Sequence, residues 1–339
     1  MPNRPDKVLH LLILATPYFN LGATTGFLDP FRAANYLQGR TLYDWTLASE
    51  AGGPCPASNG IEVTTQALAE LSDRRFDIVI LSSSWTPERN SSPRLHAQLW
   101  QWALSGSTLG ALDTGAFILA QAGLLKDRCA TVHYEHIDAL GEMYPTVNVS
   151  DALFVFDGNR ITCAGGAAST DFALHILSGT HGDAVANGAA RYLFHQSMRP
   201  PGSTQNAGAS EPLGSVTPVT LRRAISAMEA HLETPLSIAE IAAEAQVSHR
   251  QLNRLFDTYV GKTPSLYYRD IRLDRARGLV TQTDMALSQV ALASGFSSPV
   301  HFSRAYKERF GLPPRQDRVE GRVPFEFRAW PMHRPAGGT

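Results

Sequence analysis

The first 198 residues alternate between short apolar runs and stretches whose apolar residues recur at helical spacing. Residues 8–15 form a nearly continuous apolar run, as expected of a strand that is covered on both faces of a parallel sheet. Further strands are predicted at 43–49, 76–82, 108–112, 130–133, 152–156 and 160–164, helices at 25–37, 95–104, 117–122, 170–178 and 182–194, and a turn at 51–54. This order predicts a doubly wound α/β sandwich, a fold that binds ligands at the carboxyl ends of its strands.

In the last third of the chain the pattern is purely helical, and it occurs twice. Residues 236–264 and 285–314 match at an offset that grows from 49 to 50, so the second copy has one extra residue, near Ser297. Each copy predicts a short helix, a turn and a second helix preceded by Ser248 or Ser298, and serine is a favoured N-cap. Small residues, Ala242 and Ala291, let the two helices cross closely. We predict an all-α domain with tandem helix-turn-helix units; two ordinary helical hairpins remain the alternative.

A segment rich in Pro, Gly, Ser and Thr separates these two patterns. It predicts a flexible linker at 199–217 between a domain at 1–198 and a domain at 218–320, with a C-terminal tail at 321–339. Whether the tail packs on the second domain is left open.

Charge also divides the chain. Residues 215–339 hold 17 Lys and Arg against 12 Asp and Glu, a net charge of +5, whereas residues 1–214 hold 13 against 19, a net charge of −6. Fifteen of the 17 basic residues are Arg, which suits phosphate and guanine contacts. A basic surface attracts the phosphate backbone, although a solvated charged face would show a similar excess.

The stretches 261–276, 295–298 (Gly-Phe-Ser-Ser) and 310–314 (Phe-Gly-Leu-Pro-Pro) resemble the DNA-binding domain of AraC-type transcriptional regulators. The resemblance covers residues 218–320 and implies that one long helix holds the two units so that their second helices enter successive major grooves. By position, and because the apolar stripe of each helix faces inward, the outward residues are Arg250, Asn253 and Arg254 in the first unit and His301, Ser303, Arg304 and Lys307 in the second.

The two units differ in the residues that open their second helices. Pro299 and Val300 occupy positions where polar base readers often stand in the family, so we expect the first unit to be the main base reader. For Arg254 and Arg304, a phosphate contact or an ion pair with an acid of their own domain remains the alternative.

Residues 109–116 (Leu-Gly-Ala-Leu-Asp-Thr-Gly-Ala) and 119–136 resemble the nucleophile elbow region of the class I glutamine-amidotransferase-like superfamily, which includes the PfpI peptidases. The resemblance covers residues 8–195. Members place Cys at the elbow, activated by a His and often by an acid after the first strand. Here the elbow residue is Asp113, His133 lies in the histidine region, and residues 17–28 contain no acid.

An aspartate cannot replace a thiolate in acyl transfer. None of the three cysteines, Cys55, Cys129 and Cys163, is expected at a strand-to-helix turn. We therefore predict a ligand sensor and not an enzyme. An active amidase or peptidase fused to a DNA-binding domain is the alternative, and a ligand-independent architectural DNA binder is another.

The predicted ligand site surrounds the elbow. The backbone N–H groups after Asp113, at Thr114 and Gly115, can hold a carboxylate, whereas Asp113 favours a cation, so the pair suits a zwitterion. His133 is expected to line this pocket. Aromatic residues near predicted strand ends are candidates for a box around a quaternary ammonium group: Tyr18, Phe19, Trp45, Trp85 and Tyr134. Ordinary core packing remains the alternative for each aromatic, and helix capping for Asp113.

Regulators that join these two domains resemble a group that senses arginine, carnitine, choline and glycine betaine. Residues 19–35 and the elbow at 113–115 are similar to its quaternary-amine members. We expect an activator of amine or amino-acid catabolism, a homodimer formed through the α/β domain, with double-stranded DNA, a small amine or amino-acid effector and RNA polymerase as partners. No cysteine pair has metal-ligand spacing and no apolar run is long enough to span a membrane, so we expect no cofactor, no metal and a cytoplasmic location.

Overall fold

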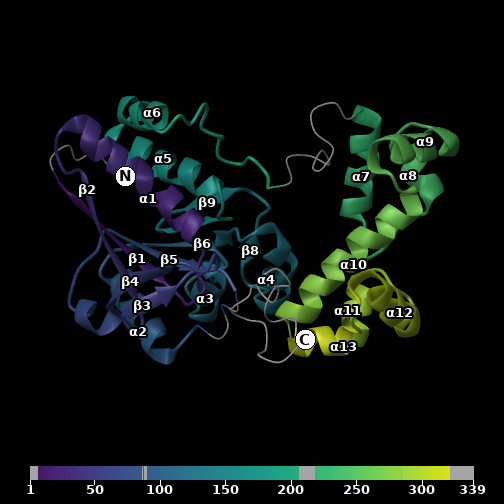
Figure 1. Ribbon diagram of the computed structural model, residues 1–339, viewed down its shortest axis with the longest axis horizontal. Helices are drawn as coiled ribbons and strands as arrows, with labels where there is room; N and C mark the ends of the chain where they lie inside the picture. Colours follow the sequence, from purple (N-terminus) through teal and green to yellow (C-terminus); the bar gives the residue numbers. More distant parts are fainter. Residues whose placement is uncertain (1–6, 86, 88–89, 206–217, 284, 321–339) are drawn as a thin grey trace, which may run out of the picture. The chain divides into compact units, whose positions relative to one another are not determined.

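Eight strands in the described part of the first unit form one mixed sheet (Figure 1). The computed structural model describes residues 7–85, 87, 90–205, 218–283 and 285–320. The chain divides into two units, residues 1–205 and 206–339. The expected linker residues 206–217 and the expected tail at 321–339 lie outside the described residues.

The strand order is β3-β4-β2-β1-β5-β6-β10-β9. The bounds are β1 (Leu9–Ala15), β2 (Tyr43–Ser49), β3 (Gly53–Pro56), β4 (Glu62–Ala67), β5 (Ile78–Ser83), β6 (Thr108–Asp113), β9 (Phe154–Asp157) and β10 (Arg160–Cys163), with β7 (Cys129–Ala130) and β8 (Asn148–Val149) in a separate pair. The six inner strands run parallel, and β3 and β9 add an antiparallel edge on each side. The predicted doubly wound α/β fold is confirmed, with a mixed rather than wholly parallel sheet.

Helices cover both faces of this sheet (Figure 1). One layer contains α1 (Leu21–Gln38), α5 (Ala168–His181) and α6 (Asp183–Tyr192), and the other contains α2 (Pro93–Leu104), α3 (Gly115–Gln121) and α4 (Ile137–Met143). Along β1, Leu11 and Ile13 pack in the first layer's core and Leu12 and Leu14 in the second layer's core. Both faces of the strand are therefore buried, which explains why its sequence is continuously apolar.

Three segments of the first unit differ from their predicted structure. The predicted turn at 51–54 leads directly into the edge strand β3, where Pro54 is tolerated because an edge position does not need every backbone donor. The predicted strand at 130–133 shortens to β7, which ends at Ala130. His133 therefore lies in the loop after β7 and not in the sheet.

The segment at 199–205, expected to be linker, is bound to the first unit. The backbone N–H and the guanidinium of Arg199 donate to the buried carboxylate of Asp171 in α5, at 2.9 and 2.7 Å. The Gln205 amide donates to the carbonyl of Val132 at 2.8 Å. Polar composition alone did not reveal these anchors, because they are made by residues distant in the sequence.

The second unit is helical. Its helices are α7 (Val219–Ala230), α8 (Ile238–Glu244), α9 (His249–Val260), α10 (Pro264–Gln282), α11 (Leu287–Ala293), α12 (Pro299–Phe310) and α13 (Pro314–Glu320). The turn between α8 and α9 spans 245–248 and that between α11 and α12 spans 294–298, so the second turn is longer by one residue, as the sequence offset predicted. Ser248 and Ser298 are N-caps: their hydroxyls accept from the backbone N–H of Gln251 and His301.

The long helix α10 joins two small cores, one for each helix-turn-helix (Figure 1). Ala242 and Ala291 are both buried in these cores, which agrees with close helix crossing. Gly295 opens the longer turn with φ of 73°, and a Cβ there would lie 2.4 Å from the carbonyl oxygen of Leu232, so only glycine fits. None of the helices among the described residues is long and apolar enough to cross a bilayer.

Candidate DNA-binding face and sensor site

The outward side of α9 presents the residues predicted for the first unit. Leu252 and Phe256 are buried in the unit's core, whereas Arg250 and Arg254 are exposed. Within the described part of the chain, neither arginine has an ion-pair partner. Asn253 is half-buried, and its amide donates to the carbonyl of His249 one turn earlier, at 3.0 Å. The arginines are thus open to a ligand, whereas Asn253 must leave a local bond to reach a base.

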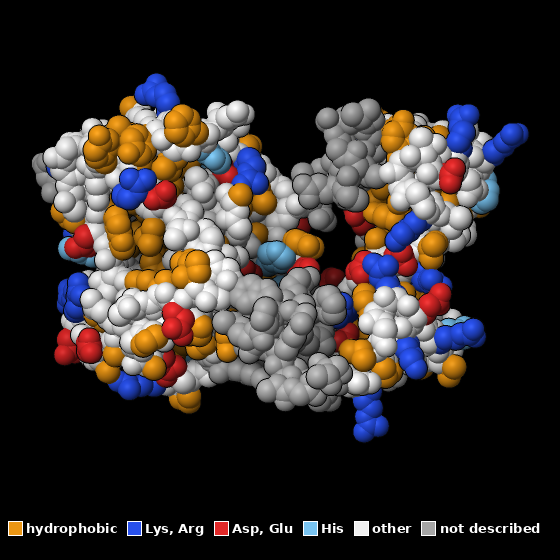
Figure 2. Space-filling model, viewed as in Figure 1, with side chains coloured by type: hydrophobic (Ala, Val, Ile, Leu, Met, Phe, Trp, Pro, Cys, Tyr) orange, Lys and Arg blue, Asp and Glu red, His pale blue; other side chains and the backbone are white. Residues whose placement is uncertain are grey.

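The corresponding side of α12 is exposed as well. Phe302 and Tyr306 fill the second core, and the predicted residues all lie outward: His301, Ser303, Arg304 and Lys307. Val300, at the start of the helix, has 75% of its surface exposed. In Figure 2, Lys and Arg side chains project from the second unit around α9 and α12. Together the two helices offer basic and apolar side chains that are not used to stabilise the fold.

Other basic residues of the second unit are structural. Arg277 of α10 donates to the buried carboxylate of Asp317 at 3.0 Å, and the Tyr306 hydroxyl donates to the same carboxylate at 2.9 Å. The guanidinium of Arg272 lies 4.8 Å from the centre of the Phe296 ring and donates to the carbonyl of Gly295. The net charge of the C-terminal third therefore overstates the charge available to a partner.

In the first unit the polypeptide turns sharply where β6 meets α3. Asp113, the last residue of β6, has φ of 58°, a conformation that is uncommon for a residue with a side chain. The turn is packed tightly against its neighbours. A Cβ on Gly115 would lie 2.5 Å from the carbonyl oxygen of Leu81, and one on Gly165 would lie 2.9 Å from the Cβ of Asp113.

The Asp113 carboxylate is buried at this turn and is held by hydrogen bonds. The side-chain amide of Asn20 donates to it at 2.8 Å. Burial raises the pKa of Asp113, and the nearby charge of His133 and the bond from Asn20 partly offset this effect. Sequence reasoning missed Asn20, although it caps α1 after the carboxyl end of β1, which is separated from β6 only by β5, and ligands are expected at this edge.

The structure brings together only some of the predicted ligand-site residues. His133 is half-buried and its charge acts on Asp113, while Tyr134 beside it is 56% exposed with its ring centre 4.5 Å from that of His133. Trp85, which follows β5, is half-buried, and its ring centre lies 6.5 Å from that of Tyr18.

Thr114 and Gly115 are buried in the turn itself. The Thr114 hydroxyl donates to the carbonyl of Ser84, and Gly115 faces the backbone of β5. The Thr114 hydroxyl is therefore used by the fold, and the role of the two backbone N–H groups as carboxylate donors stays a prediction.

Two of the predicted aromatics are placed differently from the others. Trp45 lies in the first half of β2. Across the sheet, Trp45 is level with Leu11 of β1, Ile78 of β5 and Thr108 of β6. Asp113 is five residues beyond Thr108 on β6, a distance of roughly 16 Å along the strand. Trp45 therefore lies towards the amino ends of the strands, opposite the edge that carries Asp113. Phe19 is fully buried in a small core with Ala15, Cys55 and Ala57. Its proximity to the strand end led to the prediction, but the side chain is used for packing.

Comparison with known proteins identifies both units. A helix-turn-helix domain model matches residues 241–319, and a DJ-1/PfpI family model matches residues 18–179. The HTH-type transcriptional regulator CdhR of Pseudomonas aeruginosa is 40% identical over 306 residues, which is 90% of this chain and 90% of that protein. The chain belongs to the AraC-type helix-turn-helix regulators with an N-terminal DJ-1/PfpI domain.

Two further similarities agree with membership of this regulator family. The HTH-type transcriptional regulator GbdR of P. aeruginosa is 36% identical over 316 residues, 93% of this chain and 85% of that protein. The crystal structure of an AraC family transcriptional regulator from Pseudomonas putida matches with a TM-score of 0.50 and 25% identity, over 55% of this chain and 99% of that chain. The relatives named here are transcriptional regulators and not enzymes.

One cysteine of this regulator does lie at a strand-to-helix turn, contrary to expectation. Cys163 ends β10 and precedes the loop into α5, on the strand next to the one that carries Asp113. The thiol is fully buried, and burial raises its pKa to about 12. Because a thiolate is the nucleophilic form, this raised pKa disfavours Cys163 as a nucleophile.

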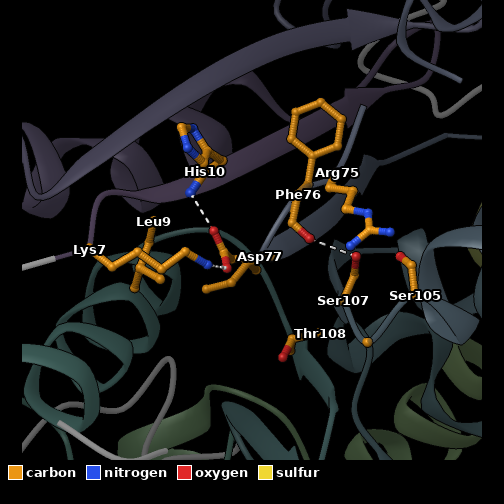
Figure 3. A pocket seen from close by; sticks show the side chains of 11 residues that line it. Lys7, Leu9, His10, Arg75, Phe76, Asp77, Ser105, Ser107 and Thr108 are labelled. Atoms are coloured by element: carbon orange, nitrogen blue, oxygen red, sulfur yellow. Dashed lines mark hydrogen bonds and ion pairs between the residues drawn. The ribbon is translucent and has the colours of Figure 1, made fainter. Parts of the chain in front are cut away.

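A cavity of about 590 Å³ lies at the other edge of the sheet in this AraC-type regulator (Figure 3). It is lined by residues before and at the amino ends of β1, β5 and β6, including His10, Asp77 and Thr108. Asp77 there accepts from the backbone N–H of His10 at 2.9 Å and pairs with Lys7. The cavity is thus separate from the elbow, and its acidic group already has a cation.

Proposed function

We propose that this protein is a transcription activator of amine or amino-acid catabolic genes that responds to a small zwitterionic effector, such as glycine betaine, carnitine or arginine. The DNA-binding units act on double-stranded DNA in the cytoplasm, and activation requires RNA polymerase as a partner. The observation that carries the effector class is the buried Asp113 carboxylate at the elbow.

The first helix-turn-helix is proposed as the main base reader. Arg250 and Arg254 are exposed on one side of α9, and an arginine can form two hydrogen bonds with guanine in the major groove. Asn253 would complete this set by pairing with adenine. In the second unit, Val300 suits contact with thymine methyl groups, and His301, Ser303, Arg304 and Lys307 suit backbone and base-edge contacts.

The effector is assigned to the carboxyl end of the sheet, next to Asp113. A buried carboxylate is costly unless a cation or several donors accompany it, and the burial that raises the pKa of Asp113 shows this cost. A trimethylammonium or guanidinium group would neutralise the charge. His133, Tyr134 and Trp85 are proposed to surround the ligand, with the two aromatic rings facing its ammonium group.

The test is isothermal titration calorimetry of the full-length protein with glycine betaine, carnitine, choline and arginine. For the ligand that binds, a neutral isostere in which carbon replaces the ammonium nitrogen, such as 3,3-dimethylbutanoate for betaine, serves as the matched control. We expect the zwitterion to bind at least tenfold more tightly than the isostere, and Asp113→Asn to remove that difference. If no amine binds, or if the isostere binds equally well, the effector assignment is wrong.

An active amidase or peptidase is the alternative function. Acyl transfer would require a thiolate, and the pKa values of the buried thiols Cys55 and Cys163 are raised to about 11 and about 12. We therefore propose a catalytically inactive sensor. A Cys55→Ser, Cys129→Ser and Cys163→Ala triple variant that still activates transcription would exclude thiol catalysis, provided that it folds.

Dimerisation is assigned to an exposed apolar patch on α1 and α6, which is visible in Figure 2. Tyr36 and Tyr192 are 68% and 41% exposed with ring centres 5.4 Å apart, and Leu37, directly after Tyr36, is 43% exposed. Exposed aromatic clusters of this kind are typical of protein interfaces. Tyr36→Lys should shift the protein from dimer to monomer in analytical ultracentrifugation, whereas Leu104→Lys, at an apolar site on α2 that is 82% exposed, should not.

A further inference from the structure

A cluster of potential metal ligands lies beside the elbow, in the loop that follows β7. His133, Glu135 and His136 each place one ligand atom so that all three atoms lie within 4.8 Å of one another. The Nδ1 atom of His133 is 3.9 Å from a carboxylate oxygen of Glu135. The three residues come from the sequence His-Tyr-Glu-His at 133–136.

The backbone explains why these side chains converge. Residues Tyr134–His136 form one 3₁₀ turn, closed by a hydrogen bond of 2.8 Å from the backbone N–H of His136 to the carbonyl of His133. In a 3₁₀ turn, residues three apart in sequence lie on the same side because each turn contains three residues. The imidazoles of His133 and His136 therefore share one side of the turn, with ring centres 6.1 Å apart.

Surrounding groups restrain this arrangement. The His136 ring lies with its centre 6.0 Å from that of Phe117, which belongs to α3 directly after the elbow. Asp113 is close enough for its ionisation to depend on the charges of both His133 and Glu135. An additional buried carboxylate behind the three ligands would stabilise a positive ion at their centre.

We propose that His133, Glu135 and His136 bind one divalent transition-metal ion, with Zn²⁺ as the best-matched species. Two imidazoles and a carboxylate form a donor set that Zn²⁺ accepts, at about 2.0–2.2 Å from each donor atom. Mg²⁺ and Ca²⁺ prefer oxygen ligands and are a poor match to the histidines. Tetrahedral ligands at these lengths stand roughly 3.3–3.5 Å apart, so the ligand atoms must approach slightly, and the exposed Glu135 can move to do this.

Three protein ligands leave one coordination position for water or a ligand oxygen. If the effector proposed above is a zwitterion, its carboxylate can take this position while its cationic group faces Asp113. This last step depends on the proposed effector, whereas metal binding does not. The two are separable because metal binding is measured without any amine present.

The experiment uses tag-free full-length protein, treated with a chelator and then dialysed, and titrated with Zn²⁺ and separately with Mg²⁺. We expect one Zn²⁺ per chain and no measurable Mg²⁺ binding. Glu135→Gln and His136→Asn should each weaken Zn²⁺ binding by at least tenfold. Both changes are at exposed or half-buried positions, and circular dichroism will verify that each variant is folded.

A matched control removes a histidine near a carboxylate elsewhere. His10 Nδ1 lies 2.6 Å from Asp44, and both side chains are exposed, so His10→Ala should leave Zn²⁺ binding unchanged. Co²⁺ substitution adds a readout of coordination, since a four-coordinate site with histidine ligands gives visible absorption bands that His136→Asn should abolish. Less than one Zn²⁺ per chain, equal affinity in a His133→Asn/His136→Asn variant, or loss of binding on Cys129→Ser instead would overturn the proposal.

Discussion

Arg309, near the end of α12 in the second helix-turn-helix, forms an ion pair with the carboxylate of Asp270 in the connecting helix α10, at 3.0 Å. The same carboxylate oxygen accepts from Lys262, just after the first recognition helix α9, at 2.7 Å. Asp270 is buried and therefore ties the carboxyl-terminal ends of both recognition helices to a single point. We expect this shared acid to help set the distance between α9 and α12, together with Asp274, to which Arg309 also donates.

Asp270→Asn is expected to loosen that connection. The variant removes the charge that both cations share. We expect it to lower the free energy of unfolding of the DNA-binding unit by about 1–2 kcal/mol. The loss is no larger because the Lys262 side chain is 44% exposed, so that solvent screens its ion pair. The looser connection can be tested by electrophoretic mobility shifts, which compare the affinity for operators that have 10 or 11 base pairs between the two contacted segments. Wild type should prefer one spacing, and the variant should lose much of this preference.

Glu308→Gln is the control for Asp270→Asn. Glu308 pairs with Arg269 at 3.6 Å and its side chain is 62% exposed, so this pair contributes little. Equal spacing preference in wild type and Asp270→Asn would show that the ion pairs do not set the geometry.

Arg254→Ala and Lys307→Ala should affect DNA binding in different ways. Loss of an arginine that reads a base costs about 1–3 kcal/mol on the cognate operator and little on unrelated DNA. Loss of a lysine that contacts a phosphate weakens binding to all sequences. It also lowers the slope of log affinity against log salt concentration by about one, because one counterion fewer is released. Fluorescence anisotropy on operator and scrambled DNA at several salt concentrations separates the two. A uniform loss for Arg254→Ala would reassign it to the phosphate backbone.

Gly165→Ala should damage the elbow, whereas Gly166→Ala should not. Both glycines have positive φ, 89° and 54°, so both substitutions carry a backbone penalty of about 1 kcal/mol. Only at Gly165 would the added Cβ meet another residue, at 2.9 Å from the Cβ of Asp113. We expect a greater loss of thermal stability and of effector affinity for Gly165→Ala than for its neighbour. Equal effects of the two substitutions would mean that the elbow accommodates the extra methyl group.

The sequence predicted the inner strands and both helix-turn-helix units because local patterns determined them, whereas β4, β8 and α4 were missed. Ser248 and Ser298 mark real helix starts, and the extra residue of the second copy lies in its turn. Contacts between distant residues could not be predicted in this way. Asn20 and Asp113 are 93 residues apart, and only the sheet order brings them together.

The positions of Trp45 and Cys163 were misjudged for two separate reasons. An apolar run predicts a strand. Whether a given residue lies near the amino or the carboxyl end of that strand depends on its place along the run. Trp45 lies only two residues into β2 and is therefore near the wrong edge. Cys163 was missed because the helix after β10 starts earlier than its apolar pattern suggests, at Ala168.

Asp171→Asn should destabilise the first unit at neutral pH but not at low pH. Burial raises the pKa of Asp171, but hydrogen bonds from Arg199 and His195 outweigh it and leave the pKa below its usual value. A lowered folded-state pKa means that the carboxylate stabilises the fold above the pKa of the unfolded chain, about 3.9, and that this stability is lost as pH falls through the folded value.

We therefore expect Asp171→Asn to lower the free energy of unfolding by about 1–3 kcal/mol at pH 7, with the difference from wild type decreasing below about pH 4. Denaturant unfolding followed by circular dichroism at pH 3 to 8 will measure it. Asp29→Asn, which breaks the exposed pair with Arg32, should cost less than about 0.5 kcal/mol. Because Asp171 holds Arg199, the variant should also make the segment at 199–205 more sensitive to proteolysis. If the difference in the free energy of unfolding between wild type and Asp171→Asn stayed constant with pH, the charge of Asp171 would not contribute to stability, and the effect would come from the change of side chain alone.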